Sequence, residues 1–137
     1  MLDKIEHIGI AIKDATNSEA LFTALFNQQP YKKEVVETEQ VSTIFYQVGD
    51  SKIELLESKS PDSAISKFIE KRGEGIHHIA FAVKDIHAEI KRLKESGFQF
   101  ISEEPKIGAD NKMICFLHPK SSNGVLIELC EERGERG

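Results

Sequence analysis

The first apolar stretch of the chain, residues 5–12, alternates larger and smaller side chains and is rich in isoleucine. A run of this length and pattern predicts a β-strand that is buried on at least one face. Further along, apolar side chains recur at helical spacing until Pro30 stops the pattern. They predict an amphipathic helix that begins at Thr16 or Asn17. The apolar positions of this helix are Ala20, Leu21, Ala24 and Leu25.

Three short strand candidates follow, at residues 34–37, 43–48 and 53–56. The last two are separated by Gly49 and Asp50, a turn signal that favours a hairpin. The first part of the chain is therefore predicted to have the element order β-α-β-β-β.

The opening strand recurs later in the chain. Residues 76–85 match residues 5–14 at six of ten positions, and the match aligns His78 with His7. Self-similarity over such a distance indicates two copies of one structural module. The second copy then predicts a helix over residues 86–96 and strands near residues 98–102, 113–118 and 125–130.

The closing strand of the module recurs as well. Residues 126–131 echo residues 52–57, which aligns Glu128 with Glu54. The opening strands are offset by 71 residues and the closing strands by 74, so the later copy carries a net insertion of three. Small insertions between matched ends usually fall in loops. Each copy is thus predicted to open with a histidine and to close with a glutamate.

A chain of 137 residues suits one compact domain that can bury most of its apolar surface. We predict a single α+β domain over residues 1–137 that is built from tandem βαβββ modules. The modules span about residues 1–57 and 76–131, and residues 58–75 form a helical linker between them. In this linker residues 61–63, Pro-Asp-Ser, can cap a short helix.

Composition narrows the class of protein. The formal charge of −5 argues against a nucleic-acid surface, and no apolar run is long enough to cross a bilayer. The N-terminal residues do not form a secretory signal, so we expect a cytoplasmic protein. Cys115 and Cys130 both lie in apolar, strand-like runs, and we expect both to be reduced and buried.

The two histidines and two glutamates are the candidate chemistry. A single histidine on an apolar strand is more often a hydrogen-bonded core residue, and a single glutamate in a strand more often faces solvent. Their recurrence at matched places changes this interpretation, because modules that pack about a pseudo-two-fold axis would bring all four together. Two imidazoles and two carboxylates suit a divalent first-row metal ion. The candidate ligands are His7, Glu54, His78 and Glu128.

Other histidines fit this pattern less well. His77 aligns with Glu6 and points to the opposite strand face from His78 by period-2 alternation, so we interpret it as a surface or outer-shell residue. His87 and His118 have no partners in the repeat, and we do not count them as ligands.

The paired modules, with their histidine openings and Ile-Glu-Leu closings, resemble the vicinal oxygen chelate superfamily, which has a glyoxalase-like fold. Within it, the chain is most similar to the methylmalonyl-CoA epimerases. The resemblance covers nearly the whole chain and is more specific than the metal residues alone. The segments that carry it are residues 60–68, 75–80, 103–109, 116–121 and 124–129.

The resemblance implies a metal-dependent isomerase that interconverts (R)- and (S)-methylmalonyl-CoA by 1,1-proton transfer through a metal-stabilised enolate, an activity of propionate metabolism. It implies one divalent ion held by the four candidate ligands, with Co²⁺ favoured and Mn²⁺, Ni²⁺, Mg²⁺ or Zn²⁺ as alternatives. It also places Glu128 against the reacting carbon as a catalytic base. The expected partner is a small-molecule acyl-CoA, and the expected assembly is a homodimer.

One departure from the resembling family concerns the second base. Some epimerases have a second glutamate at the position of Thr43, and threonine is a poor base at neutral pH. Glu37, Glu39, Glu54 or a metal-bound water remain alternatives for the second proton carrier. For the coenzyme A phosphates or the malonyl carboxylate, Lys120 is the best candidate. Lys106 and Lys112 are at least as well explained as solvated loop lysines.

Two other functions remain open from the sequence. A glyoxalase I-like lactoylglutathione lyase would use the same four ligands, and a non-catalytic small-molecule-binding protein could share the fold. The epimerase-like segments outside the metal set argue against the first, and retention of all four ligand types argues against the second.

Overall fold

The structure of the protein is a computed structural model that describes residues 1–132. The chain forms two compact units. The first unit consists of residues 7–77. The second consists of residues 1–6 together with residues 78–132. Each unit is described separately below.

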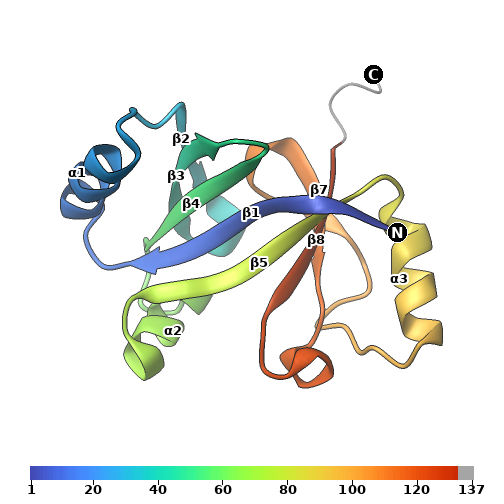
Figure 1. Ribbon diagram of the computed structural model, residues 1–137. Coiled ribbons are helices and arrows are strands. Elements are labelled where there is room, and N and C mark those ends of the chain that lie inside the picture. The colour runs from blue at the N-terminus through green and yellow to red at the C-terminus, as the bar shows by residue number, and fades with distance from the viewer. Residues whose placement is uncertain (133–137) are drawn as a thin grey trace. The chain divides into compact units, whose positions relative to one another are not determined.

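The first unit contains a four-stranded mixed sheet in the order β2-β3-β4-β1 (Figure 1). Strand β1 pairs in parallel with β4, whereas β2 with β3 and β3 with β4 pair antiparallel. The 3₁₀ turn η1, Glu37–Glu39, connects β2 to β3. The element bounds are β1 Leu2–Ile12, α1 Ala15–Phe26, β2 Lys32–Val36, β3 Val41–Val48 and β4 Ser51–Ser58. The predicted order β-α-β-β-β is confirmed.

Helix α1 begins two or three residues earlier than predicted. Its N-cap is Asp14, whose carboxylate accepts a hydrogen bond from the Asn17 backbone N–H at 3.3 Å. The prediction of Thr16 or Asn17 as the cap is therefore wrong. Asp14 directly follows the strand, and its extended backbone and acceptor oxygen satisfy a free N–H of the first turn.

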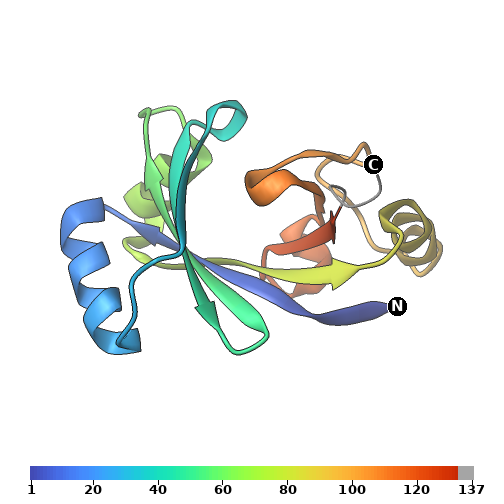
Figure 2. The ribbon, with the colours of Figure 1, turned by 90° about the horizontal axis from the view of Figure 1, so that it is seen from above.

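The predicted apolar face of α1 is also wrong. Leu21 and Leu25 are 60% and 66% exposed, and the residues that pack on the sheet are Phe22 and Phe26. Figure 2 shows α1 lying beside the strands of this unit. The two phenylalanines offer more buried area per side chain than leucine, so their face is turned inward. The core beneath the helix is formed by Ile12, Ile44, Tyr46 and Leu55.

Helix α2, Ala64–Arg72, follows β4 in the same unit. Its N-cap is Ser63, which lies within the segment 61–63 predicted to cap the helix, and Ser63 accepts a hydrogen bond from the Ser66 backbone N–H at 3.0 Å. The helix ends at Gly73, where the backbone takes a φ of 79° that favours glycine. None of the helices within residues 1–132 is long and apolar enough to span a membrane.

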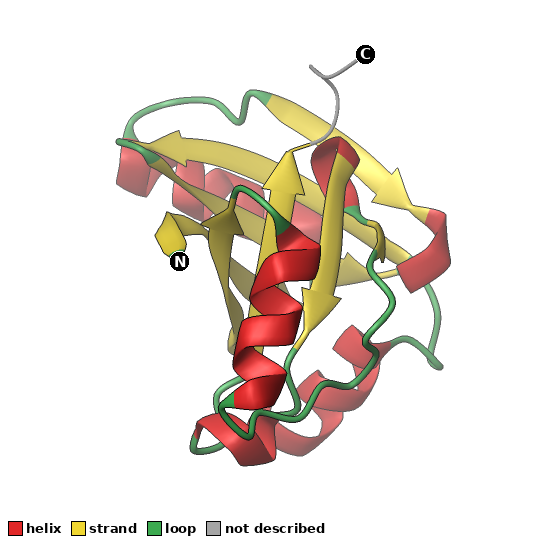
Figure 3. Ribbon diagram, turned by 90° about the vertical axis from the view of Figure 1, so that its right-hand side faces the viewer, coloured by secondary structure: helices red, strands yellow, loops and turns green. Residues whose placement is uncertain are grey.

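The second unit repeats the plan with the sheet order β5-β8-β7-β6. Strand β5 pairs in parallel with β8, and β7 pairs antiparallel with β8 and β6. Figure 3 shows α3 lying in front of the strands. Its apolar residues join a buried cluster that includes Ile86, Ile90 and Leu129. The element bounds are β5 Gly75–Val83, α3 Ile86–Glu95, β6 Lys106–Ile107, β7 Lys112–Phe116 and β8 Ile127–Glu132.

The strand predicted near residues 98–102 is wrong. Only Phe100 pairs there, in an isolated antiparallel bridge to Leu117, and the edge strand of the sheet is instead β6. Phe98 and Phe100 alternate like strand residues, but they use their rings to pack against the cluster under α3. Burial of two aromatic rings thus explains the apolar pattern without a regular strand.

Candidate active site

A histidine and a glutamate from neighbouring parallel strands meet in the first unit. In the register of β1 with β4, Gly9 lies opposite Glu54, and His7 lies two residues earlier on the same face. The Nδ1 atom of His7 is 3.2 Å from Oε2 of Glu54. Both residues are buried, with 5% and 4% of their surface exposed.

The second unit contains the equivalent pair. Ala80 lies opposite Glu128 in the register of β5 with β8, and His78 lies two residues before Ala80. The Nε2 atom of His78 is 2.9 Å from Oε1 of Glu128, and both residues are buried. The structure therefore joins each predicted histidine to its predicted glutamate within one unit.

The surroundings of the two glutamates are duplicated as well. On the antiparallel side, Phe45 lies opposite Glu54 and Phe116 lies opposite Glu128. The ring of Phe116 also meets the imidazole of His78 edge-on, with the ring centroids 5.7 Å apart. Each carboxylate therefore lies between a small residue on its parallel neighbour and a phenylalanine on its antiparallel neighbour.

The donor atoms of the pairs fit a divalent metal ion. Imidazole nitrogen and carboxylate oxygen are ligands of first-row dications, and two carboxylates would neutralise the charge of the ion. Burying a carboxylate is costly unless a strong partner compensates for the lost water. Each buried glutamate here has an imidazole beside it, and a cation would add a further partner.

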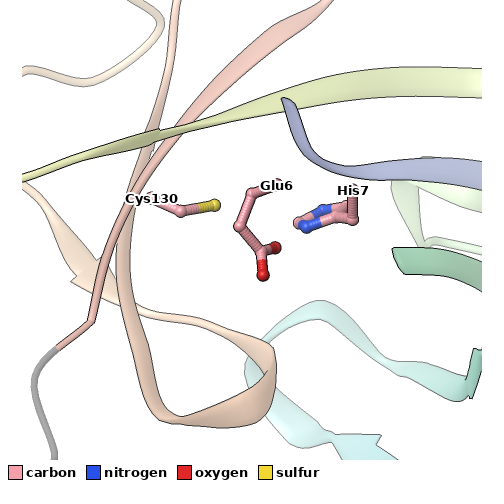
Figure 4. A group of neighbouring side chains, drawn as sticks. All are labelled: Glu6, His7 and Cys130. Atoms are coloured by element: carbon pink, nitrogen blue, oxygen red, sulfur yellow. The ribbon is translucent and has the colours of Figure 1, made fainter. Parts of the chain in front are cut away.

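A third acidic residue was missed by sequence reasoning. Glu6 is 6% exposed, and one of its carboxylate oxygens lies within 4.8 Å of the Cys130 Sγ in the second unit. Figure 4 shows this carboxyl group and this thiol, together with His7, the next residue of β1. The repeat aligns Glu6 with His77, which is only half-buried, so the repeat gives no signal for the burial of Glu6.

Both cysteines are free and buried, as expected. Burial, followed by the nearby charge of Glu128, raises the pKa of the Cys115 thiol from 9.0 to about 12. The charged thiolate is the nucleophile in thiol chemistry, so this residue should be inert near neutral pH.

We therefore expect that Cys115 in the folded Cys130→Ala variant does not react with a disulfide reagent at pH 8 within minutes. Unfolding in guanidinium should release one reactive thiol per chain. The measurement is a colorimetric thiol count before and after unfolding. Stoichiometric reaction of the folded variant would contradict the burial of this thiol.

The remaining histidines lie where the sequence placed them, outside the pairs. His77 is half-buried, and its ring meets Phe68 of α2 edge-on at 5.0 Å. His87 is exposed on α3, and the Nδ1 of His118 accepts a hydrogen bond from the Lys120 backbone N–H at 3.1 Å.

The candidate lysines differ from one another. Lys120 lies exposed in the 3₁₀ turn η3, Pro119–Ser122, and Lys106 is exposed on the edge strand β6. Lys112 is only 8% exposed, so the prediction of a solvated loop lysine is wrong for it. Its side chain lies on the same face of the β7–β8 ladder as Glu128, and its Nζ is 3.6 Å from a carboxylate oxygen of Glu132.

Comparison with known proteins places the chain in a family. The profile of the Glyoxalase/Bleomycin resistance protein/Dioxygenase superfamily matches residues 6–116, and the chain belongs to this superfamily. Its glyoxalase-like α+β fold, predicted from the sequence, is confirmed.

Individual relatives cover almost all of the chain. It is 39% identical to the ethylmalonyl-CoA/methylmalonyl-CoA epimerase of Cereibacter sphaeroides, over 94% of this chain and 98% of the relative. It is 35% identical to the uncharacterised protein YqjC of Bacillus subtilis, over 98% of this chain and 96% of the relative. A solved structure of a methylmalonyl-CoA epimerase in complex with methylmalonyl-CoA and NH₄⁺ superposes with a TM-score of 0.91, at 34% identity over 98% of this chain and 97% of the other.

Proposed function

We propose that the protein is a metal-dependent epimerase that interconverts (R)- and (S)-methylmalonyl-CoA by 1,1-proton transfer. The observation that carries the proposal is the duplicated pair of buried side chains, His7 with Glu54 at 3.2 Å and His78 with Glu128 at 2.9 Å. The proposed substrate is supported by similarity to the Cereibacter epimerase and to the epimerase structure that holds methylmalonyl-CoA.

In this proposal the four side chains of the two pairs hold one divalent ion. Bound there, the ion would act as a Lewis acid that stabilises negative charge on the thioester oxygen of the substrate. The neutral imidazoles leave the overall charge of the four ligands at −2, which a dication compensates. Co²⁺, Mn²⁺, Ni²⁺, Mg²⁺ and Zn²⁺ are all consistent with these donor types.

Glu128 is proposed to act as the base on one face of the substrate. Its carboxylate takes the α-proton, the electrons of the C–H bond pass into the thioester, and an enolate results. His78 beside it holds the carboxylate at 2.9 Å, and Phe116 on the neighbouring strand contributes an apolar wall. An apolar surrounding strengthens the attraction between charges and limits the competing access of water.

Further parts of the proposal concern the surroundings of the site. Lys120, exposed in its turn, is proposed to attract the acyl-CoA through its phosphates or its carboxylate. We also propose that the chain folds as a single domain with duplicated modules and assembles as a homodimer. Its proposed location is the cytoplasm, and its proposed role is in propionate metabolism. The exposed Leu21 and Leu25 on α1 provide apolar surface that a second copy could cover.

The proposal is tested by substrate preference. Metal-loaded protein should invert the α-centre of methylmalonyl-CoA, and it should convert a glutathione hemithioacetal no faster than the metal-free blank. Both reactions can be followed with one preparation by chiral analysis of the acyl group and by the absorbance of the lactoyl thioester. Turnover of the hemithioacetal alone would establish a glyoxalase I-like lyase, and binding of either compound without turnover would establish a binding protein.

A further inference from the structure

A buried hydroxyl group on the face of Glu54 has no hydrogen-bond partner. Thr43 is 0% exposed, and within residues 1–132 its Oγ has no partner within hydrogen-bonding distance. In the β3–β4 register it lies opposite Leu56, two residues from Glu54, so its side chain shares the face of that carboxylate. A buried polar group without a partner costs free energy, which a ligand or a proton-transfer partner can compensate.

The cross-strand neighbour of this hydroxyl on the other side is an acid. Glu34 of β2 lies directly opposite Thr43, and directly opposed residues of antiparallel strands project from the same face. Their Cβ atoms are expected to be about 4.5–5.5 Å apart. The Glu34 side chain is 31% exposed, and Oε1 is 3.4 Å from the Nζ of Lys32.

The face that carries this acid is distinct from the outer face of the strand. Along β2, residues 32, 34 and 36 are half-buried or buried, whereas residues 33 and 35 are exposed. The next row of paired residues on this face, two positions along the strands, places Phe45 opposite both Lys32 and Glu54. Glu34 and Thr43 therefore lie one rung away from a member of the proposed metal site, on the same face of the sheet.

The duplicated unit shows that the sheet itself does not require these polar groups. Ile114 occupies the place of Thr43 in the β7–β8 ladder, and it packs in an apolar cluster with Ala80 and Cys130. Lys106 lies opposite Ile114, in the place of Glu34. The hydroxyl and the acid thus break the internal symmetry at one rung, in one unit only.

We infer that Glu34 is the second proton carrier of the proposed epimerisation and acts through the hydroxyl of Thr43. This inference rests on the proposed function. After Glu128 has taken the α-proton, the Thr43 O–H gives its proton to the opposite face of the enolate carbon. The Glu34 side chain does not hydrogen-bond the Thr43 hydroxyl in this structure, so the step requires it to turn toward that oxygen. The Thr43 oxygen then takes the proton of the Glu34 carboxylic acid at the same time, and Glu34 ends as a carboxylate. The reverse reaction runs through the same groups in the opposite order.

Position in the ladder favours Glu34 over Glu37 and Glu39, and exposure favours it over the buried Glu54. A proton carrier has to exchange its proton with solvent between turnovers, and a side chain that is about one-third exposed allows this. Glu37 and Glu39 belong to the 3₁₀ turn η1, outside the paired rungs of β2 and β3. Thr43 touches the substrate in this arrangement, and Glu34 acts through it.

The test compares inversion with α-proton exchange in D₂O for each enantiomer of methylmalonyl-CoA, using the metal-loaded full chain. In Glu34→Gln and Thr43→Val, inversion should fall at least about a hundredfold, the lower end of the usual range for losing a positioned acid or base. The enantiomer whose proton faces Glu128 should still exchange within about threefold of the unmodified rate. The other enantiomer should lose exchange and inversion together.

Two further variants, together with the melting temperature of Thr43→Val, separate this role from a structural one. Thr43→Ser keeps the hydroxyl and should restore inversion to within about threefold. Thr43→Val is isosteric and removes a buried hydroxyl without a partner, so its melting temperature should be unchanged or higher. Lys33→Gln removes a charge from the outer face of β2 and should leave both rates unchanged.

Several outcomes would overturn the inference. Equal loss of exchange for both enantiomers in Glu34→Gln would show a defect in binding or folding. Unchanged inversion in Glu34→Gln, or the expected pattern in Glu37→Gln instead, would remove Glu34 from the mechanism while leaving the proposed function intact. Absence of exchange and inversion in the unmodified protein would contradict the proposed function and this inference with it.

Discussion

Replacing Glu128 with glutamine is expected to lower the rate of epimerisation by about two to four powers of ten, the usual cost of losing a positioned general base. Glutamine keeps the shape of the side chain and one oxygen donor, so metal should bind more weakly yet detectably. The measurement is the rate of inversion at saturating metal, together with exchange of the substrate α-proton with deuterated solvent.

The matched control is the same substitution at the duplicated position. Glu54 has the same immediate neighbours as Glu128, a small residue on one side and a phenylalanine on the other. In the proposed mechanism it only holds the ion, and the resembling family tolerates glutamine there, so Glu54→Gln should lose much less activity. Inactivity of Glu54→Gln with an active Glu128→Gln would mean that the two units exchange their proposed roles.

Removal of either paired histidine should abolish stoichiometric metal binding. The unmodified protein is expected to retain one divalent ion per chain after dialysis, whereas His7→Ala and His78→Ala should each bind it at least on the order of a hundredfold more weakly. Loss of an outer-shell partner alone costs about 10–100-fold in affinity, and loss of a direct ligand should cost more. The measurement is elemental analysis after equilibrium dialysis against a defined metal concentration.

His87→Ala is the control for this experiment, because His87 is exposed on α3 outside both pairs. It should bind metal like the unmodified protein. Full occupancy in His7→Ala or in His78→Ala would remove that residue from the proposed ligand set.

The duplication explains why much of the fold could be predicted from the sequence. The same strand pattern occurs at residues 5–12 and again at residues 76–83, so the sequence indicates this element twice. The matched His and Glu positions then predict that these four side chains serve one site. The structure brings His7 to Glu54 and His78 to Glu128 through the same parallel register in both units.

The errors in the predicted helix face and in the predicted strand at residues 98–102 arise where phenylalanine side chains are buried in a way that the spacing of apolar residues does not reveal. On α1 the spacing of Leu21 and Leu25 is as helical as that of Phe22 and Phe26, and only packing against the sheet decides which face is buried. Phe98 and Phe100 alternate like a strand but serve as core residues beside α3. Periodicity identifies an apolar face, but it does not show which partner covers that face.

The proposed role of Glu34 could not be predicted from the sequence, for a different reason. The sequence identifies the missing glutamate at Thr43, but it contains no information on which residue of β2 pairs with that threonine. A shift of one residue in the pairing would have turned Glu34 to the outer face. Only the register of β2 with β3 reveals that an acid lies directly across the ladder.

The central claim, that this chain inverts the α-centre of an acyl-CoA, is tested most directly by one NMR measurement. Metal-loaded protein is incubated in D₂O with a single enantiomer of methylmalonyl-CoA, and the α-proton signal is followed alongside enantiomeric excess. The proposed function predicts that the α-proton is replaced by deuterium while the enantiomeric excess decays to zero, both far faster than in the metal-free blank. Retention of the α-proton and of the enantiomeric excess at the blank rate would contradict it.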